Sequence, residues 1–477
     1  MTRIETVEAL RPAYDLIVIG AGPAGMSAAT EAARHGLSVL LADENPGPGG
    51  QIYRAITETP VQNRAILGDA YWAGAPVAEA MAAAAIDYAP GATIWHLDKH
   101  LELGLSIGGR ARTVSAQRVI IATGAQERPF PIKGWTLPGV TTIGAAQTLL
   151  KSGGVVARGR VVLAGCGPLL WLLAAQYVEA GAPPSLILDT TPSENWAKAL
   201  PSALSFMASP YFAKGLGLML KVRRKVKVVS GVTALAIEGE EHATAITWKK
   251  GDGAEQRFAA DHILLHQGVV PHVNLANAAG VPLAWNEDQA CFQPEADAWG
   301  QTPVEGIALA GDGMGIGGAE AAATRGHLAG IAAAAALGRL TPARRDELAA
   351  PFRARLAKEL RGRVFLDRLY KPAPHFRRAA DEAMACRCEE VSGKTLREVV
   401  SLGVPGPNQL KAFLRCGMGP CQGRLCGLTV TETIAEARGC SQAEVGYYRL
   451  RTPVKPLTLG EMATMPASES DVKAVVR

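Results

Sequence analysis

Two sets of residues in this chain have types and spacings that could do chemistry. The first is a glycine-rich turn, Gly20-Ala-Gly-Pro-Ala-Gly25, which directly follows an apolar run. A turn of this spacing lets the backbone approach a pyrophosphate, and a helix that begins there presents free N–H groups to it. Asp43 follows one helix and one strand later, where a carboxylate can accept hydrogen bonds from both ribose hydroxyls. The turn and the acid together predict a site for an adenine dinucleotide.

Cysteines form the second set, since six of the eight lie between Cys386 and Cys440. Clustered cysteines in a reducing compartment indicate metal ligation before disulfides. Four of them form two close pairs, which can enclose two irons bridged by sulfides or one structural zinc ion. The four are Cys386, Cys388, Cys416 and Cys421. We expect Cys426 and Cys440 to be small buried apolar side chains.

The glycine-rich turn needs a strand before it, a helix after it and a second strand that ends at the acid. The apolar run 15–19 predicts the first strand, an alanine-rich helix then ends at Gly36, and the second strand ends at Asp43. These elements make a complete βαβ unit.

Three later segments are predicted to surround the same site. The loop from Glu44 to Tyr53, with Gly50 and Gln51, is rich in turn-forming residues and would pass near the ring end of the nucleotide. The strand that begins at Arg118 breaks at Ala-Thr123-Gly124, where small residues let backbone pass close to a cofactor. A third strand carries Gly311 and Asp312 at its carboxyl end, where open α/β sheets bind ligands, and an alanine-rich helix over 319–336 follows.

A second unit of the same kind begins at Arg160 and ends at Asp189, but it lacks the third glycine, whose place Leu170 takes. A leucine there prevents the close approach of helix and strand and crowds the path of a pyrophosphate, so nicotinamide binding is not expected. The first 380 residues also contain no Cys-x-x-Cys or Cys-x4-Cys pair, which excludes a thiol–disulfide reductase mechanism.

These pieces, in this order, resemble the pyridine-nucleotide-disulfide reductase superfamily over residues 15–337. The resemblance implies an α/β fold with two Rossmann-like dinucleotide-binding domains and a small C-terminal helical domain. It assigns FAD, or another adenine nucleotide, to the first site. The residues that it implies as cofactor-binding are Gly20, Gly22, Pro23, Ala24, Gly25, Asp43, Glu44, Gly50, Gln51, Thr123, Gly124, Gly311 and Asp312.

The cysteine module resembles the bacterioferritin-associated ferredoxin-like [2Fe–2S] domain through Cys-Arg-Cys-Glu-Glu-Val and Arg-Cys-Gly-Met-Gly-Pro-Cys. That resemblance implies a [2Fe–2S] cluster with Cys386, Cys388, Cys416 and Cys421 as ligands. We divide the chain into residues 1–150 with 286–340 for FAD, 151–285 for the degenerate second domain, 341–380 as a helical linker, 381–445 for the cluster and 446–477 as an extended tail. The tail is basic and could bind a partner or a flavin phosphate.

Taken whole, the chain resembles the A (α) subunits of opine oxidases, of D-hydroxyproline and proline dehydrogenases and of hydrogen cyanide synthase, and more remotely the sarcosine oxidase α subunit. The resemblance implies an electron-transfer subunit that acts on CH–NH donors only within a hetero-oligomer. A β subunit of the D-amino-acid-oxidase type would hold its own FAD and oxidise the amine, with FMN at the interface and with or without a small third subunit. The alternatives are a stand-alone NAD(P)H-dependent flavin or ferredoxin reductase, the α subunit of a hydrogen cyanide synthase- or proline dehydrogenase-type complex, and a ferredoxin-type docking module.

Composition excludes other classes of function. A net charge of +5 over 477 residues, with no basic run interleaved with aromatic residues, gives no reason to expect nucleic-acid binding. The uncharged stretch 161–178 contains Gly-Cys-Gly-Pro and predicts a strand, a turn and a buried helix rather than a membrane span. The N-terminus lacks the apolar segment of a secretory signal, so we expect a cytoplasmic protein. We assign no catalytic residue, because His266, His272 and His327 are isolated in the sequence and we expect them to be structural.

Overall fold

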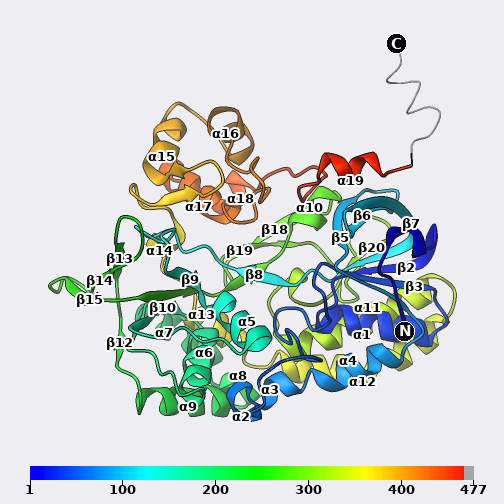
Figure 1. The fold of residues 1–477 in the computed structure, drawn as a ribbon, viewed down its shortest axis with the longest axis horizontal. Coiled ribbons are helices and arrows are strands. Elements are labelled where there is room, and N and C mark those ends of the chain that lie inside the picture. Colours follow the sequence, from blue (N-terminus) through cyan, green and yellow to red (C-terminus); the bar gives the residue numbers. More distant parts are fainter. Residues whose placement is uncertain (467–477) are drawn as a thin grey trace.

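The structure is a computed structural model that describes residues 1–466, and residues 467–477 of the predicted tail lie outside the described part. Two sheets, each with helices beside it, form the larger part of the molecule, and a lobe of short helices lies above them (Figure 1). The predicted α/β class with two Rossmann-like units and a small helical C-terminal domain is confirmed.

The first sheet has eight strands in the order β1-β4-β3-β2-β7-β6-β5, and β20 pairs with β7. Strands β1 to β4, β7 and β20 pair in parallel, whereas β5 and β6 join antiparallel. Their bounds are β1 Thr2–Arg3, β2 Ala13–Ile19, β3 Val39–Asp43, β4 Asp87–Pro90, β5 Thr93–Leu97, β6 Glu102–Ile107, β7 Arg110–Ile121 and β20 Ile307–Leu309.

Helices α1 (Pro23–Arg34) and α11 (Ala319–Ala336) pack closely against each other beside this sheet. Small residues make the close approach possible, because a Cβ at Gly326 would lie 2.1 Å from the carbonyl oxygen of Ala24, and one at Gly330 would lie 2.7 Å from that of Ala28. The predicted βαβ unit and the predicted helix over 319–336 are therefore both confirmed. The shorter helix α4 (Ala75–Ala83) packs on α1.

The second sheet is parallel throughout, with five strands in the order β12-β11-β10-β16-β9. Strand β10 runs through a turn into the buried helix α6, as predicted for the uncharged stretch 161–178. None of the helices in residues 1–466 combines the length and apolar character that a membrane span requires. The bounds here are β9 Val140–Thr142, α5 Ile143–Gly153, β10 Val161–Cys166, α6 Pro168–Glu179, β11 Leu186–Asp189, α7 Glu194–Ala199, α8 Ala203–Met207, α9 Pro210–Arg223, β12 Val228–Ser230 and β16 His262–Gln267.

A three-stranded antiparallel sheet and two two-stranded antiparallel sheets complete the part before residue 341. The three strands are β13 Ala234–Glu238, β14 Ala245–Lys249 and β15 Gln256–Ala259. One two-stranded sheet pairs β8 (Ala125–Glu127) with the distant β17 (Val269–Pro271), and the other is a hairpin of β18 (Leu283–Asn286) and β19 (Cys291–Pro294). Helix α10 (Asn274–Ala278) follows β17.

Beyond residue 340 the chain is mainly helical. Helices α12 (Pro342–Glu359) and α13 (Arg363–Leu369) lead to a proline-rich break and to α14 (Pro374–Arg377). The cysteine module, which we call the cluster module after the iron–sulfur cluster predicted from its sequence, comprises β21 (Met384–Cys386), β22 (Val391–Ser392), α15 (Gly393–Ser401), α16 (Pro407–Leu414), α17 (Gly427–Arg438) and α18 (Gln442–Val445). It has its own apolar core, and the following chain returns to the first sheet, where α19 (Leu459–Ala463) contacts β7 (Figure 1).

Candidate functional site

The glycine-rich turn between β2 and α1 has a shape that only glycine allows at two of its positions. Gly20 has a φ of +106°, and a Cβ there would lie 2.5 Å from the carbonyl oxygen of Ala122. A Cβ at Gly25 would lie 1.7 Å from the carbonyl oxygen of Gly20. A Cβ at Gly22 would meet the Cα of Gly50 at 3.8 Å, an ordinary contact, and Gly22 precedes α1, whose first N–H groups have no side-chain cap. The turn therefore leaves a helix N-terminus available to an anion.

Asp43 at the end of β3 is buried and holds this turn in place. Its Oδ2 accepts a hydrogen bond from the N–H of Ala21 at 2.5 Å, and its Oδ1 accepts from both nitrogens of Asn45 at 2.7 and 2.6 Å. A carboxylate oxygen can accept more than one hydrogen bond, so capacity for a ribose hydroxyl remains. Glu44 next to it forms an ion pair with Lys455, which brings the C-terminal segment to the same edge of the sheet.

The other predicted segments converge on the turn. A Cβ at Gly311 would lie 2.7 Å from the Cβ of Ala24, and one at Gly50 would lie 2.9 Å from the Cα of Gly22. Gly313 lies against the backbone of Gly124 in the same way. The structure thus brings together the loops after β2, β3, β7 and β20 at the carboxyl edge of the first sheet, where ligands of open α/β sheets bind.

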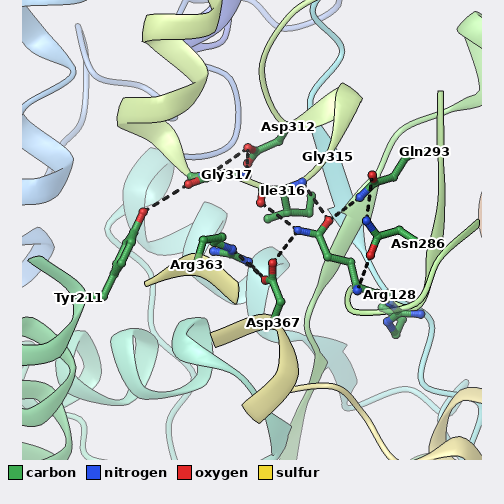
Figure 2. A network of polar contacts seen from close by, with 12 residues as sticks. Arg128, Tyr211, Asn286, Gln293, Asp312, Gly315, Ile316, Gly317, Arg363 and Asp367 are labelled. Atoms are coloured by element: carbon green, nitrogen blue, oxygen red, sulfur yellow. Dashed lines mark hydrogen bonds and ion pairs between the residues drawn. The ribbon is translucent and has the colours of Figure 1, made fainter. Parts of the chain in front are cut away.

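Asp312 orders the loop that follows β20. Its Oδ1 accepts hydrogen bonds from the N–H groups of Gly317 and Gly318, at 2.8 and 3.0 Å. Figure 2 shows how a polar network continues from this loop to α13. The Gln289 side chain amide donates to the carbonyl of Ile316 and to Asp367 of α13, at 3.0 and 2.9 Å.

Arg128, the residue that directly follows β8, extends this network. Its guanidinium donates to the carbonyls of Gln289 and Ala290, at 2.7 and 2.9 Å. Sequence reasoning gave neither Gln289 nor Arg128 a role in the site, because single polar residues on separate segments leave no periodic signal.

The second dinucleotide turn is filled by the chain itself. A Cβ at Gly165 would lie 1.6 Å from the carbonyl oxygen of His266, and Leu170 is fully buried. The segment after α13 lies on this turn, since the Cys166 thiol donates to the Tyr370 carbonyl at 3.5 Å and Asn195 donates to the carbonyls of Leu369 and Lys371 at 3.1 and 2.8 Å. The turn therefore lacks the open edge that the first turn has.

Five of the cysteines gather their thiols in the cluster module. The thiol of Cys386 contacts those of Cys416 and Cys426, and the thiol of Cys421 contacts those of Cys426 and Cys388. The sulfurs thus form a chain of contacts, and within residues 1–466 no three side chains of His, Cys, Asp or Glu are spaced to hold a single metal ion.

Backbone N–H groups are directed at the same sulfurs. Those of Glu389 and Gly417 donate to Cys386, and those of Gly423 and Leu425 donate to Cys421. The S–H groups of Cys416 and Cys426 donate to Cys386 and lower its pKa to about 2, and the S–H of Cys426 lowers the pKa of Cys421 to about 5. Thiolates surrounded by N–H donors have the chemistry that iron–sulfur clusters require.

Cys426 needs a correction to the prediction made from sequence. It is buried as expected, but its thiol lies among those of the predicted ligands rather than in apolar surroundings alone. Cys440, by contrast, is partly buried against the apolar core of the module.

The module is fixed to the rest of the molecule close to the first site. Gln126 of β8 donates to the carbonyl of Arg424 at 2.7 Å, and Asn274 of α10 donates to that of Gln422, also at 2.7 Å. An open hollow of about 430 Å³ lies at the loop between Cys416 and Cys421, and its lining includes Arg415, Met418, Gly419 and Lys455.

The three histidines have contacts that fit structural roles. His266 and His327 pair with Glu127 and Glu31, at 2.8 and 2.9 Å. Burial lowers the pKa of His272 to about 4, so its imidazole is neutral at pH 7.

Comparison with known proteins agrees with these observations. The family model described as pyridine nucleotide-disulphide oxidoreductase matches residues 14–336, and the model described as sarcosine oxidase A3 domain matches residues 385–465. In the solved structure of L-proline dehydrogenase from P. horikoshii, the fold is similar at a TM-score of 0.69 and 19% identity, over 97% of this chain and 80% of that one.

Curated relatives match along nearly the whole chain. The HcnB subunit of hydrogen cyanide synthase from Pseudomonas protegens is 28% identical, over 96% of this chain and 98% of the relative. The A subunit of opine oxidase from Agrobacterium tumefaciens is 50% identical over 472 residues, which cover 97% of this chain and 94% of the relative. With this identity over this length, the chain belongs to the family of opine oxidase A subunits, within the pyridine nucleotide-disulphide oxidoreductases, and is an oxidoreductase.

Proposed function

We propose that this chain is the electron-transfer subunit of a heteromeric dehydrogenase that oxidises the CH–NH bond of an opine or a related secondary amine. One observation carries the proposal: a module rich in thiolates is hydrogen-bonded through Gln126 and Asn274 to the segments next to the first nucleotide site. Two sites so close in one chain suit the passage of electrons between them.

The first site would hold FAD or another adenine nucleotide. The N–H groups at the start of α1 would contact the pyrophosphate, Asp43 the ribose and the loop of Asp312 the chain that leads to the ring. A bound flavin supplies two-electron and one-electron chemistry at one ring. Gly20 and Gly25 shape the turn, and Gly50 packs the following loop against it.

The module would hold a [2Fe–2S] cluster through Cys386, Cys388, Cys416 and Cys421. Two features support iron over zinc: the sulfurs are spread along a chain of contacts instead of surrounding one point, and N–H groups are directed at two of them. Hydrogen bonds to the sulfurs are one of the features that set the potential of an iron–sulfur cluster, so these donors would tune it.

Substrate oxidation would take place on a partner β subunit with its own FAD, with FMN at the interface and with or without a small third subunit. Within residues 1–466 we find no nucleophile–base pair at the first site, since His266 and His327 pair with Glu127 and Glu31, and His272 is neutral at pH 7. The relatives are themselves named as subunits, one of opine oxidase and one of hydrogen cyanide synthase.

Co-purification of the chain with its partner, followed by extraction and mass spectrometry of bound nucleotides and assay of iron and sulfide, tests the proposal. We expect an adenine nucleotide and two irons per chain, opine oxidation by the complex and none by the isolated chain. A Cys416→Ser variant should lose the iron, while the matched Cys440→Ser variant should retain it. Full turnover by the isolated chain, or rapid bleaching of its flavin by NADH, would contradict the proposal and favour a self-sufficient reductase.

A further inference from the structure

Cys426 is a thiol that the four-ligand assignment leaves without a role. It precedes α17 directly, it is 1% exposed, and its sulfur contacts those of both Cys386 and Cys421. Cys416 contacts Cys386, and Cys388 contacts Cys421. The Cys426 thiol therefore links these two pairs of cysteines.

Tyr448 holds this thiol from the opposite side. Its hydroxyl lies 3.7 Å from the Sγ of Cys426, and its ring is fully buried. The ring also fixes the ligand loop, because a Cβ at Gly417 would lie 2.6 Å from it and one at Gly423 would lie 2.8 Å from it. The N–H groups of these two glycines donate to Cys386 and Cys421. One tyrosine therefore positions both the backbone donors and the extra thiol.

We propose that Cys426 is not an iron ligand but donates its S–H to the ligand sulfurs of Cys386 and Cys421, and that it thereby raises the reduction potential of the cluster. The inference rests on the proposed function, since it concerns the cluster assigned there. The hydroxyl of Tyr448 donates to the Cys426 sulfur and directs the S–H toward the ligands. Cys426 and Tyr448 are positioning residues for the cluster.

The physical basis is the electron density on the ligand sulfurs. A hydrogen bond to a thiolate withdraws density from it and stabilises the reduced cluster, which carries one more negative charge. The four ligands already complete two irons, so a fifth buried sulfur has no iron left to bind. A buried sulfur that binds no metal keeps its proton and can act as a donor.

The test compares Cys426→Ala, Cys426→Ser and Tyr448→Phe with Cys440→Ala, a control in the same module, each in the complete complex. The readouts are iron and sulfide per chain and the midpoint potential from an EPR-monitored redox titration. We expect Cys426→Ala to retain iron and sulfide and to shift the potential to lower values. Cys426→Ser should lower the potential by less than Cys426→Ala does, because its O–H can replace the lost donor in part. Cys440→Ala should leave the potential unchanged.

Tyr448→Phe should shift the potential in the same direction by less. The double variant Cys426→Ala/Tyr448→Phe should have the same midpoint potential as Cys426→Ala alone, because the tyrosine hydroxyl acts through the thiol.

Four results would overturn the inference or its basis. Loss of iron from both Cys426 variants, with the native circular dichroism retained, would make Cys426 a ligand. An unchanged potential in Cys426→Ala would make it a packing residue only. If Cys426→Ala fails to fold, the potential of Tyr448→Phe decides, and a value equal to wild type with the same EPR spectrum counts against the inference. Absence of iron and sulfide from the wild-type complex would instead refute the cluster itself.

Discussion

Lys151 is a buried amine next to the first nucleotide site. Its side chain is 1% exposed, and its Nζ donates to the Gln51 carbonyl at 3.1 Å and to the Gln147 side chain at 2.8 Å. Burial lowers its pKa from 10.5 to about 7. Between pH 7 and pH 10 the unfolded chain therefore binds a proton that the native chain does not, so the free energy of unfolding rises with pH, by at most about 1.4 kcal/mol per unit.

We expect Lys151→Met to abolish this part of the pH dependence. Urea unfolding of wild type, Lys151→Met and the exposed control Lys394→Met at pH 7, 8 and 9 checks it. Wild type and the control should gain stability across this range relative to Lys151→Met. Parallel pH profiles for all three proteins would show that Lys151 remains charged in the native state.

Gly25 is the residue of the turn with the least room for a side chain. A Cβ there would lie 1.7 Å from the carbonyl oxygen of Gly20, so Gly25→Ala must displace the helix or the turn. We expect a loss of roughly 2 to 4 kcal/mol in the free energy of unfolding and of most bound nucleotide. Gly217→Ala in α9, with nothing near its Cβ, is the matched control and should retain its nucleotide and gain up to about 1 kcal/mol. Thermal unfolding and nucleotide assay measure both, and equal nucleotide content would contradict the turn assignment.

At the scale of elements, one carboxylate on α17 connects the cluster module to the rest of the molecule. Glu432 on α17 has a fully buried side chain. It forms ion pairs with Arg377 at the end of α14 and, at 3.8 Å, with Arg128 after β8. Removing one partner of a buried pair leaves the other charges unpaired, which costs about 3–5 kcal/mol. We expect Glu432→Ala to loosen the module, and limited proteolysis between α14 and β21 measures this.

Glu436 on the same helix offers a control for that experiment. It pairs with Arg378 and Arg397 but is about a third exposed, so Glu436→Ala should cost about 1 kcal/mol or less and leave proteolysis slow. Equal cleavage rates in the two variants would mean that the buried pairs do not hold the module in place.

Elements with a local signal could be predicted from the sequence, and elements with long-range partners could not. The βαβ unit, the strand–turn–helix over 161–178 and the bounds of α11 follow from apolar runs and glycine spacing. The pairs of Glu432 with Arg128 and of Gln289 with Asp367 join residues far apart in the chain, and no periodicity marks them. The contact of Cys426 with the ligand thiols depends on a loop geometry that spacing alone does not fix.

At the scale of the whole molecule, the two Rossmann-like units differ in whether another segment covers their glycine-rich turn. The first turn leads into α1, whose first N–H groups have no side-chain cap, whereas the second turn is covered by the segment after α13. That segment reaches the second sheet because α12 and α13 carry the chain from the first sheet across to it (Figure 1). The long helical connection thus closes one nucleotide site while it leads to the cluster module.

Restoring the missing glycine should therefore not restore nicotinamide binding. Leu170 is fully buried, so Leu170→Gly should leave a cavity and cost about 3 kcal/mol or more. The Tyr370 carbonyl, which accepts from the Cys166 thiol, and the Asn195 contacts to Leu369 and Lys371 would still cover the turn. We expect neither wild type nor Leu170→Gly to bind NADH in calorimetry or to show flavin bleaching when NADH is added anaerobically. Tight NADH binding by either protein would mean that this segment moves aside in solution, and electrons could then enter the chain from a nicotinamide as well as from its partner.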